Sequence, residues 1–346
     1  MLLDEPKESF LRKETMFDYQ LGNQPLDVVQ DYIPMGATTT LFGQPGLGKT
    51  FAAMSLVMSV VTSKPWCGAS VDVTGNAGML SFECSQEEVH RRIQGYMSYF
   101  GLTREMITHD PIIRHNKGLS LKLPKHKDTL KAFIEKEELR LLVIDTLAKV
   151  MEFKEDSTSD MATFATCLSN IAAETTCAIV VVHHEAKGSY GKKKGTSRSS
   201  NALEGDVRSE MRIHNFGGLT LSHTKVNNST QRNDVHFNLV DQYLGDDRYG
   251  RPMNTKVFVP QITPEEQAED FNSNLNTFTL DEYRNSRNIA DSTARKELKN
   301  LQDNKYIIKP SYHSKMYEST YELNQIIRDK LYSRLVTDNE QIDLTG

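Results

Sequence analysis

Residues 43–50 read Gly43-Gln44-Pro45-Gly46-Leu47-Gly48-Lys49-Thr50, where four residues separate Gly43 from Gly48 and a lysine and a threonine follow. This spacing matches the phosphate-binding loop, or P-loop. Glycine allows backbone N–H groups to approach phosphate oxygens, and a helix that begins near Lys49 directs the positive end of its dipole at the same oxygens. We expect Lys49 to reach the β- and γ-phosphates of ATP and Thr50 to hold Mg²⁺. The expected nucleotide-binding residues are Gly43, Gln44, Pro45, Gly46, Leu47, Gly48, Lys49, Thr50 and Phe51.

Short, nearly continuous apolar runs surround this loop, and stretches of helical character separate them. Runs without alternation fit strands that are covered on both faces, as in a parallel sheet. Strands and helices in turn predict an α/β fold with right-handed crossovers. After His184 the apolar residues alternate, which predicts an antiparallel extension of the sheet. The expected parallel strands are residues 38–43, 78–83, 141–145 and 178–183, the helices 50–62, 86–100, 127–137 and 160–175, and the antiparallel strands 208–216, 219–226 and 234–240.

The chain of 346 residues suggests two domains, at about 100–200 residues per domain. Residues 263–275 are acidic and contain few large apolar side chains, which is typical of a linker. Segment 276–324 contains two expected helices followed by a β-hairpin, which is the pattern of a winged-helix module. We therefore expect an N-terminal arm (1–25), an ATPase core (26–262), the linker, the winged-helix-like module, and a C-terminal helix and tail (325–346).

Composition narrows the class of protein. The net charge of -5, from 41 basic and 46 acidic residues, excludes a strongly basic nucleic-acid coat. No apolar run approaches the roughly 20 residues of a membrane helix, and the N-terminus carries acids where a signal peptide carries basic residues. The four cysteines show no metal-binding spacing and are too few for a disulfide scaffold. These features predict a reduced, cytoplasmic protein without a membrane partner.

Two carboxylates follow expected strands. Asp145 ends an apolar run, so we expect it at the carboxyl edge of the sheet, where it can support the metal ion. Glu83 ends another run, where it can polarise the water that attacks the γ-phosphate. The alternatives are that Asp145 and Glu83 are helix-capping residues. Ser85 and Glu88 form a capping-box pattern that already accounts for the next helix start.

A pair of histidines, His183 and His184, closes the fourth apolar run. Neighbouring strand residues point to opposite faces, so one of the two imidazoles is expected to face the γ-phosphate edge. Zinc binding is the alternative, but cysteines or acids at ligand spacing are missing from the neighbouring sequence.

The order of these motifs resembles that of the RecA-like ATPases, and most closely the small hexameric replicative helicases of plasmids and phages, the RepA-like group. The resemblance covers roughly residues 26–240 and is densest in residues 80–92, 180–187 and 198–203. It implies that Lys49 and Thr50 bind the triphosphate and Mg²⁺, that Glu83 activates water, and that Asp145 supports the metal. It further implies that the histidine pair senses the γ-phosphate.

In such helicases a lysine and an arginine reach from one subunit into the ATP site of its neighbour. The resemblance therefore suggests Lys225 and Arg232 for this role, since the positive charge of an arginine finger accelerates phosphoryl transfer. The two residues lie further apart in this sequence than such pairs usually do. A solvated hairpin tip is the alternative for both.

A basic, glycine-rich segment follows the histidine pair directly. Its composition suits a loop that binds phosphate backbones and stacks one base, and in a ring the matching loop lines the central channel. A solvated lysine-rich surface loop is the alternative. The expected nucleic-acid contacts are Lys187, Tyr190, Lys192, Lys193, Lys194 and Arg198.

Together these features predict an ATP-hydrolysing motor on single-stranded DNA, a homo-hexameric replicative helicase of a phage, plasmid or other mobile element. The winged-helix-like module is a candidate contact for a replication partner. One alternative is an ATP-dependent DNA-binding switch or loader without processive unwinding. Another is an ATPase ring that acts on proteins, which would not require the basic segment.

Overall fold

The computed structural model describes residues 27–115, 121, 123–146, 158–185, 205–227, 230–261, 277–287, 291–303, 307–309 and 316–319. The predicted N-terminal arm, the linker, the C-terminal tail and all six expected nucleic-acid contacts lie outside these residues.

A nine-stranded sheet forms the centre of the molecule, with the strand order β11-β10-β9-β8-β3-β7-β6-β4-β5. The strands from β8 to β5 in this order are parallel, and β9, β10 and β11 extend the sheet in antiparallel fashion. The predicted α/β class with an antiparallel extension is therefore confirmed. The strands are β3 (Thr38–Gly43), β4 (Asn76–Ser81), β5 (Pro111–His115), β6 (Leu139–Asp145), β7 (Ala178–His184), β8 (Ser209–Asn215), β9 (Leu219–Val226), β10 (Val235–Asp246) and β11 (Pro252–Pro260), and a separate hairpin pairs β1 (Asp27–Val29) with β2 (Ile33–Pro34).

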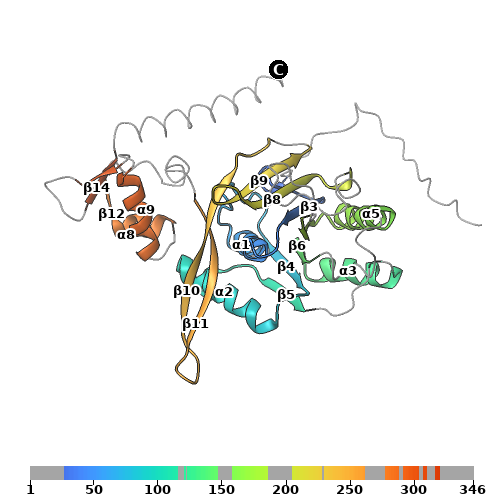
Figure 1. Cartoon of the computed structure of the whole chain (residues 1–346), viewed down its shortest axis with the longest axis horizontal. Helices are drawn as coiled ribbons and strands as arrows, with labels where there is room; N and C mark the ends of the chain where they lie inside the picture. Colours follow the sequence, from blue (N-terminus) through green and yellow to red (C-terminus); the bar gives the residue numbers. More distant parts are fainter. Residues whose placement is uncertain are drawn as a thin grey trace, which may run out of the picture.

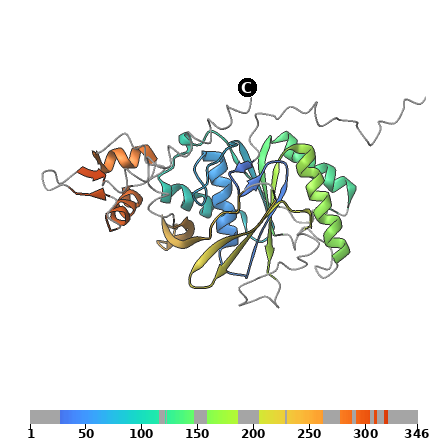
Figure 2. The ribbon, with the colours of Figure 1, turned by 90° about the horizontal axis from the view of Figure 1, so that it is seen from above.

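Helices cover both faces of the sheet, which is why its central strands are buried and almost continuously apolar. α1 (Lys49–Thr62) and α2 (Gln86–Phe100) lie on one face, and α3 (Pro124–Lys136) and α5 (Thr158–Thr175) lie on the other (Figures 1 and 2). The predicted boundaries of α2, β3 and β9 agree with the structure residue for residue.

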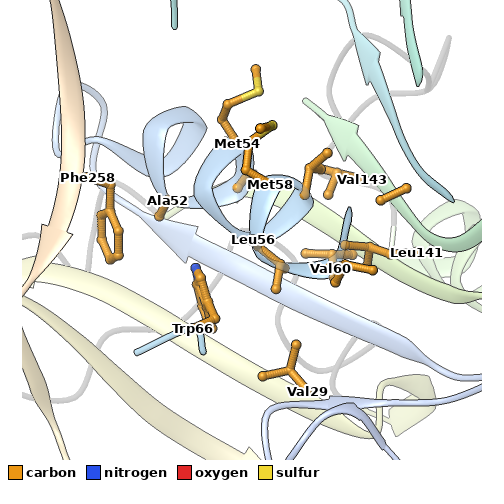
Figure 3. Close-up of a cluster of buried hydrophobic side chains, with 14 of the residues drawn as sticks. Val29, Ala52, Met54, Leu56, Met58, Val60, Trp66, Leu141, Val143 and Phe258 are labelled. Atoms are coloured by element: carbon orange, nitrogen blue, oxygen red, sulfur yellow. The ribbon is translucent and has the colours of Figure 1, made fainter. Parts of the chain in front are cut away.

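α1 is the most enclosed helix of the core, with apolar side chains on most of its surface (Figure 3). Trp66 packs beside it, where the indole N–H donates a 2.9 Å hydrogen bond to the Ser55 hydroxyl and the ring stacks on Phe258 of β11. The β10–β11 ribbon thus curls over α1 and α2, which fixes the helix that carries the P-loop residues against the sheet.

The structure differs from the sequence-based expectations at several strands. β5 and β11 were not expected, and β10 runs six residues beyond the predicted end at Val240. β5 lies at the edge of the sheet, and β11 begins with proline and is largely exposed in its first half, so neither shows the apolar run of a buried strand. β4 ends at Ser81, so Glu83 does not end a strand but lies two residues beyond it.

A small module follows the core. β12 (Thr277–Thr279), β13 (Ile307–Ile308) and β14 (Met316–Ser319) form a three-stranded sheet beside α8 (Leu280–Arg287) and α9 (Asp291–Asp303). Its core contains Phe278, Tyr283, Ala294, Leu298, Leu301, Ile307 and Tyr317. The hydroxyl of Thr293 donates a 3.1 Å hydrogen bond to the carbonyl of Tyr99 near the end of α2, so the module contacts the core. None of the helices within the described ranges is both long and apolar enough to cross a bilayer.

Candidate nucleotide-binding site

The P-loop connects the end of β3 to the start of α1 at the carboxyl edge of the parallel strands. Two of its glycines are favoured for different reasons, one by a close contact and one by its backbone conformation. A Cβ at Gly43 would lie 2.3 Å from the carbonyl oxygen of Ile213 on the neighbouring β8. Gly46 has a φ of +81°, which favours glycine, and the position of its missing Cβ faces open space. The close approach of β8 thus accounts for glycine at position 43, and the left-handed backbone conformation accounts for glycine at position 46.

Lys49 is buried at the start of α1 with only 6 % of its surface exposed. Its ammonium donates 2.9 Å hydrogen bonds to the carbonyl oxygens of Gly43 and Gln44. Burial lowers the pKa of Lys49 to about 8, although the negative charges of Asp145, Glu83 and Glu185 oppose this shift. Because both hydrogen bonds go to neutral carbonyl groups, the charge of the ammonium is available to a phosphate.

Asp145 ends β6 beside Lys49 and is 1 % exposed. Burial raises its pKa to about 6, and the charge of Glu83 adds to this effect. The hydroxyl of Thr50 and the charges of Arg92 and Lys49 act in the opposite direction. A buried carboxylate next to a threonine hydroxyl provides the oxygen ligands that Mg²⁺ prefers, so these residues fit the ion. When bound, Mg²⁺ neutralises charge on the phosphates of the nucleotide.

Glu83 is exposed and lies between the end of β4 and α2. The hydroxyl of Thr146, the residue after Asp145, donates a 2.9 Å hydrogen bond to the Glu83 carboxylate. This bond holds the Glu83 carboxylate near the end of β6. Ser85 caps α2 in a capping box with Glu88, as the sequence predicted, so Glu83 is not used as the cap. The role of Thr146 was missed because its partner is distant in sequence.

The two histidines lie at the end of β7, where His183 pairs with Phe42 and His184 with Gly43 of β3. Alternation places His184 on the face of Val182, toward α1 and the P-loop, and the fully buried His183 on the opposite face. Within the described ranges, no group of three or more His, Cys, Asp or Glu residues is arranged to hold a metal ion.

Arg92 of α2 belongs to this site but was not singled out in the sequence. Its guanidinium donates to the Cys84 sulfur at 3.0 Å, lies 4.5 Å from the centre of the Phe51 ring, and acts on the charge of Asp145. An arginine within a helix does not by itself indicate the direction in which its side chain points. The capping box at Ser85, however, defines the start of the helix, and this start could have been used to predict which face carries Arg92.

A buried ion pair was also missed. Glu185 and Arg212 are 0 % and 2 % exposed, and the guanidinium donates to the carboxylate at 2.5 Å. The pair joins the end of β7 to β8, beside the last residues of β3.

Lys225 and Arg232 lie away from the P-loop of their own chain. Lys225 pairs with Glu210 toward the amino ends of the parallel strands, and its ammonium donates to the Val207 carbonyl at 3.0 Å. Arg232 forms a 3.1 Å ion pair with Asp31 and a hydrogen bond with Gln30, and both partners lie in the turn between β1 and β2. The structure therefore does not bring either residue to the site that contains Lys49 and Asp145.

The comparison with known families agrees with this geometry. The sequence model of the AAA domain matches residues 8–190, slightly more than half of the 346 residues. The match includes the P-loop, Glu83, Asp145 and the histidine pair. The AAA domain is a nucleotide-dependent ATPase domain of the P-loop type, which typically acts with Mg²⁺. The chain belongs to the AAA domain family.

Proposed function

We propose that this protein is an ATP-driven motor that translocates on single-stranded DNA, a homo-hexameric replicative helicase of a phage, plasmid or other mobile element. The observation that carries the proposal is the group of buried charges at the carboxyl edge of the sheet, where Lys49 and Asp145 lie beside Glu83. This edge also holds the end of β7, after which the basic segment from Lys187 to Arg198 follows in sequence.

In the proposed reaction, water attacks the γ-phosphate in line with the leaving group. Glu83 orients this water and accepts its proton, and the hydrogen bond from Thr146 holds the carboxylate in place. Lys49 turns from its loop carbonyls to the phosphates. Thr50 and Asp145 would hold Mg²⁺. Positioning and charge stabilisation supply most of the rate.

Lys225 and Arg232 are proposed to act in the ATP site of a neighbouring copy. Both lie away from the P-loop of their own chain, so a contribution to catalysis requires a second copy. In the free chain Arg232 is paired with Asp31, and assembly would exchange this partner for the triphosphate of the neighbour.

Mixing two inactive variants tests the shared site. Glu83→Gln and Arg232→Ala are each expected to hydrolyse little ATP. Mixed complexes contain interfaces with an intact Glu83 and an intact Arg232, so mixing is expected to restore activity. Lys225→Ala in place of Arg232→Ala identifies which residue acts. No restored activity with either partner would contradict a shared site.

The salt dependence of DNA binding tests the basic segment. Neutralising Lys192, Lys193 and Lys194 together removes three candidate phosphate contacts. The slope of log affinity against log salt is expected to fall by about two, at roughly 0.7 per contact on a single strand. An unchanged slope would assign these lysines to a solvated surface.

The module after the core, β12 to β14 with α8 and α9, is proposed to be a winged-helix-like docking unit. Segment 276–324 contains eight Lys and Arg and seven Asp and Glu residues, so its net charge of +1 is small for a reader of duplex DNA. A protein partner in replication fits this charge better than a duplex does.

A further inference from the structure

The turn between β8 and β9 presents an exposed aromatic ring. Phe216 is 37 % exposed, although most large apolar side chains of the described core are buried. The turn continues with Gly217 and Gly218, and a Cβ built at Gly217 would meet nothing within 4 Å. The turn therefore exposes the Phe216 side chain, and no side chain at the next position covers it.

This turn lies at the same sheet edge as the P-loop. β8 runs parallel to β3, and Ile213 pairs with Gly43, the first residue of the P-loop. Phe216 lies three residues further along the chain, which corresponds to about 10 Å beyond this level. A ligand that stacks on Phe216 is thus close to bound nucleotide and to the end of β7.

The ring of Phe216 contacts two polar side chains, those of Arg212 and His214. The Arg212 guanidinium lies 5.3 Å from its centre, and the His214 ring lies 4.9 Å away at an angle of 33°. The Phe216 N–H donates to Nδ1 of His214, whose Nε2 is 2.9 Å from the Ser222 hydroxyl. These contacts fix the orientation of an aromatic side chain that solvent would otherwise leave free.

Arg212 is itself fixed by a buried partner. Its ion pair with Glu185 is nearly inaccessible to water, and the Glu185 N–H donates a 3.1 Å hydrogen bond to the carbonyl of Gly43. The same carbonyl accepts a hydrogen bond from Lys49. A buried ion pair contributes little net stability, so a role in placing the ring accounts for it better than stability does.

A single exposed phenylalanine is ordinary on a protein surface. Phe216 differs from such a residue because a buried cation lies beside the ring and because the two glycines that follow carry no side chains that could cover it. A rigid ring beside an arginine is the chemistry with which proteins stack nucleobases. We propose that Phe216 is a stacking platform for a nucleobase, with Arg212 and Glu185 as its positioning residues.

The base can come from single-stranded DNA or from the nucleotide at the P-loop, since both would lie at this edge. The DNA source rests on the proposed function, and the nucleotide source does not. The experiment therefore uses the full chain in two arms. One arm titrates fluorescein-labelled single-stranded DNA in the presence of a non-hydrolysable ATP analogue, and the other titrates the analogue alone by calorimetry.

Phe216→Ala is expected to weaken the binding of either the DNA or the analogue about tenfold. A loss of this size is within the range measured when one aromatic side chain that stacks on a base is replaced by alanine. Phe216→Trp should retain the affinity because it retains a ring. Tyr249→Ala is the matched control, since Tyr249 is 65 % exposed at the tip of the β10–β11 ribbon and also lies beside arginines, Arg248 and Arg251. This control should leave both affinities unchanged.

The two arms separate the possible failures. A loss in the analogue arm with no DNA binding by the unchanged protein would support the platform and contradict the proposed function. Normal DNA binding with less than a twofold effect of Phe216→Ala in both arms would overturn the platform alone. An equal loss in Tyr249→Ala would also overturn it.

The positioning role has a test of its own. The double variant Glu185→Leu/Arg212→Met removes both buried charges, so that neither is left uncompensated and the fold is retained. This double variant is expected to weaken binding in the same arm of the experiment as Phe216→Ala does. Unchanged affinity in a folded double variant would show that the ion pair does not position the ring.

Discussion

Charged residues at the carboxyl edge of the core sheet differ from those on α9 of the C-terminal module. At the sheet edge, Lys49, Asp145 and Arg212 are at most 6 % exposed. On α9, the ion pair of Arg295 with Asp291 has side chains that are 64 % and 46 % exposed. Lys296 and Lys299 are exposed as well. The same residue types are thus used in two different environments.

The difference shows which charged residues lower the stability of the folded protein. Removing a charge from water costs free energy, and burial accordingly lowers the pKa of Lys49 and raises that of Asp145. Exposed pairs such as that of Arg295 contribute little because water and salt screen them. Charges that are kept buried despite this cost indicate a binding site, whereas the charges of α9 indicate a solvated surface.

The largest effect is expected for Lys49→Ala at the sheet edge. This variant loses the ammonium that binds the β- and γ-phosphates, so affinity for ATP should fall by about two orders of magnitude or more. Calorimetric titration with a non-hydrolysable analogue measures this loss, and Lys64→Ala, two residues beyond the other end of α1, serves as the control. Unchanged affinity would remove Lys49 from the site.

Glu83→Gln separates chemistry from binding at the same edge. The amide keeps the size of the side chain but cannot accept a proton, so turnover should fall by roughly 10²–10³-fold while nucleotide affinity is retained. Thr146→Val removes the hydrogen bond to Glu83 and is expected to reduce turnover by a smaller factor. A near-normal rate for Glu83→Gln would exclude this residue as the base.

Asp145→Asn tests whether burial of charge costs stability. In the folded protein the pKa of Asp145 is raised from 3.8 to about 6, so its contribution is fully present below pH 3.8 and is lost as the pH rises through 6. Asparagine remains neutral, and the nucleotide-free variant should be more stable than the natural protein by about 3 kcal/mol at pH 7.

Denaturant unfolding at pH 5 and pH 8 measures this effect. The gain from Asp145→Asn should be larger at pH 8, while Mg²⁺-dependent turnover is lost. A variant that is destabilised at both pH values would contradict the account of Asp145 as a costly buried charge.

The smallest effect is expected on the module. Arg295→Ala, Lys296→Ala and Lys299→Ala together should leave the Tm and the ATPase rate unchanged, because these side chains are solvated. Thermal unfolding and a steady-state ATPase assay measure the two quantities. A large loss of DNA binding in this triple variant would instead give the module a direct role in nucleic-acid recognition.

The sequence was sufficient for the elements whose signals are local. The P-loop, the buried strand β3 and the capping box at Ser85 each depend on neighbouring residues, and the structure has all three where they were predicted. Contacts between distant segments gave no such signal. Thr146 and Glu83 are 63 residues apart in sequence, and Arg212 and Glu185 are 27 apart, so only the sheet register brings them together. β11 was missed because the residues of its first half are largely exposed and form no continuous apolar run.

Steady-state ATP hydrolysis with and without single-stranded DNA tests the central claim most directly, with molecular mass measured on the same sample. The account predicts Mg²⁺-dependent hydrolysis by an assembly of several copies, a severalfold increase with DNA, and loss of both rates in Glu83→Gln. A monomer that neither binds nor hydrolyses ATP under these conditions would contradict it.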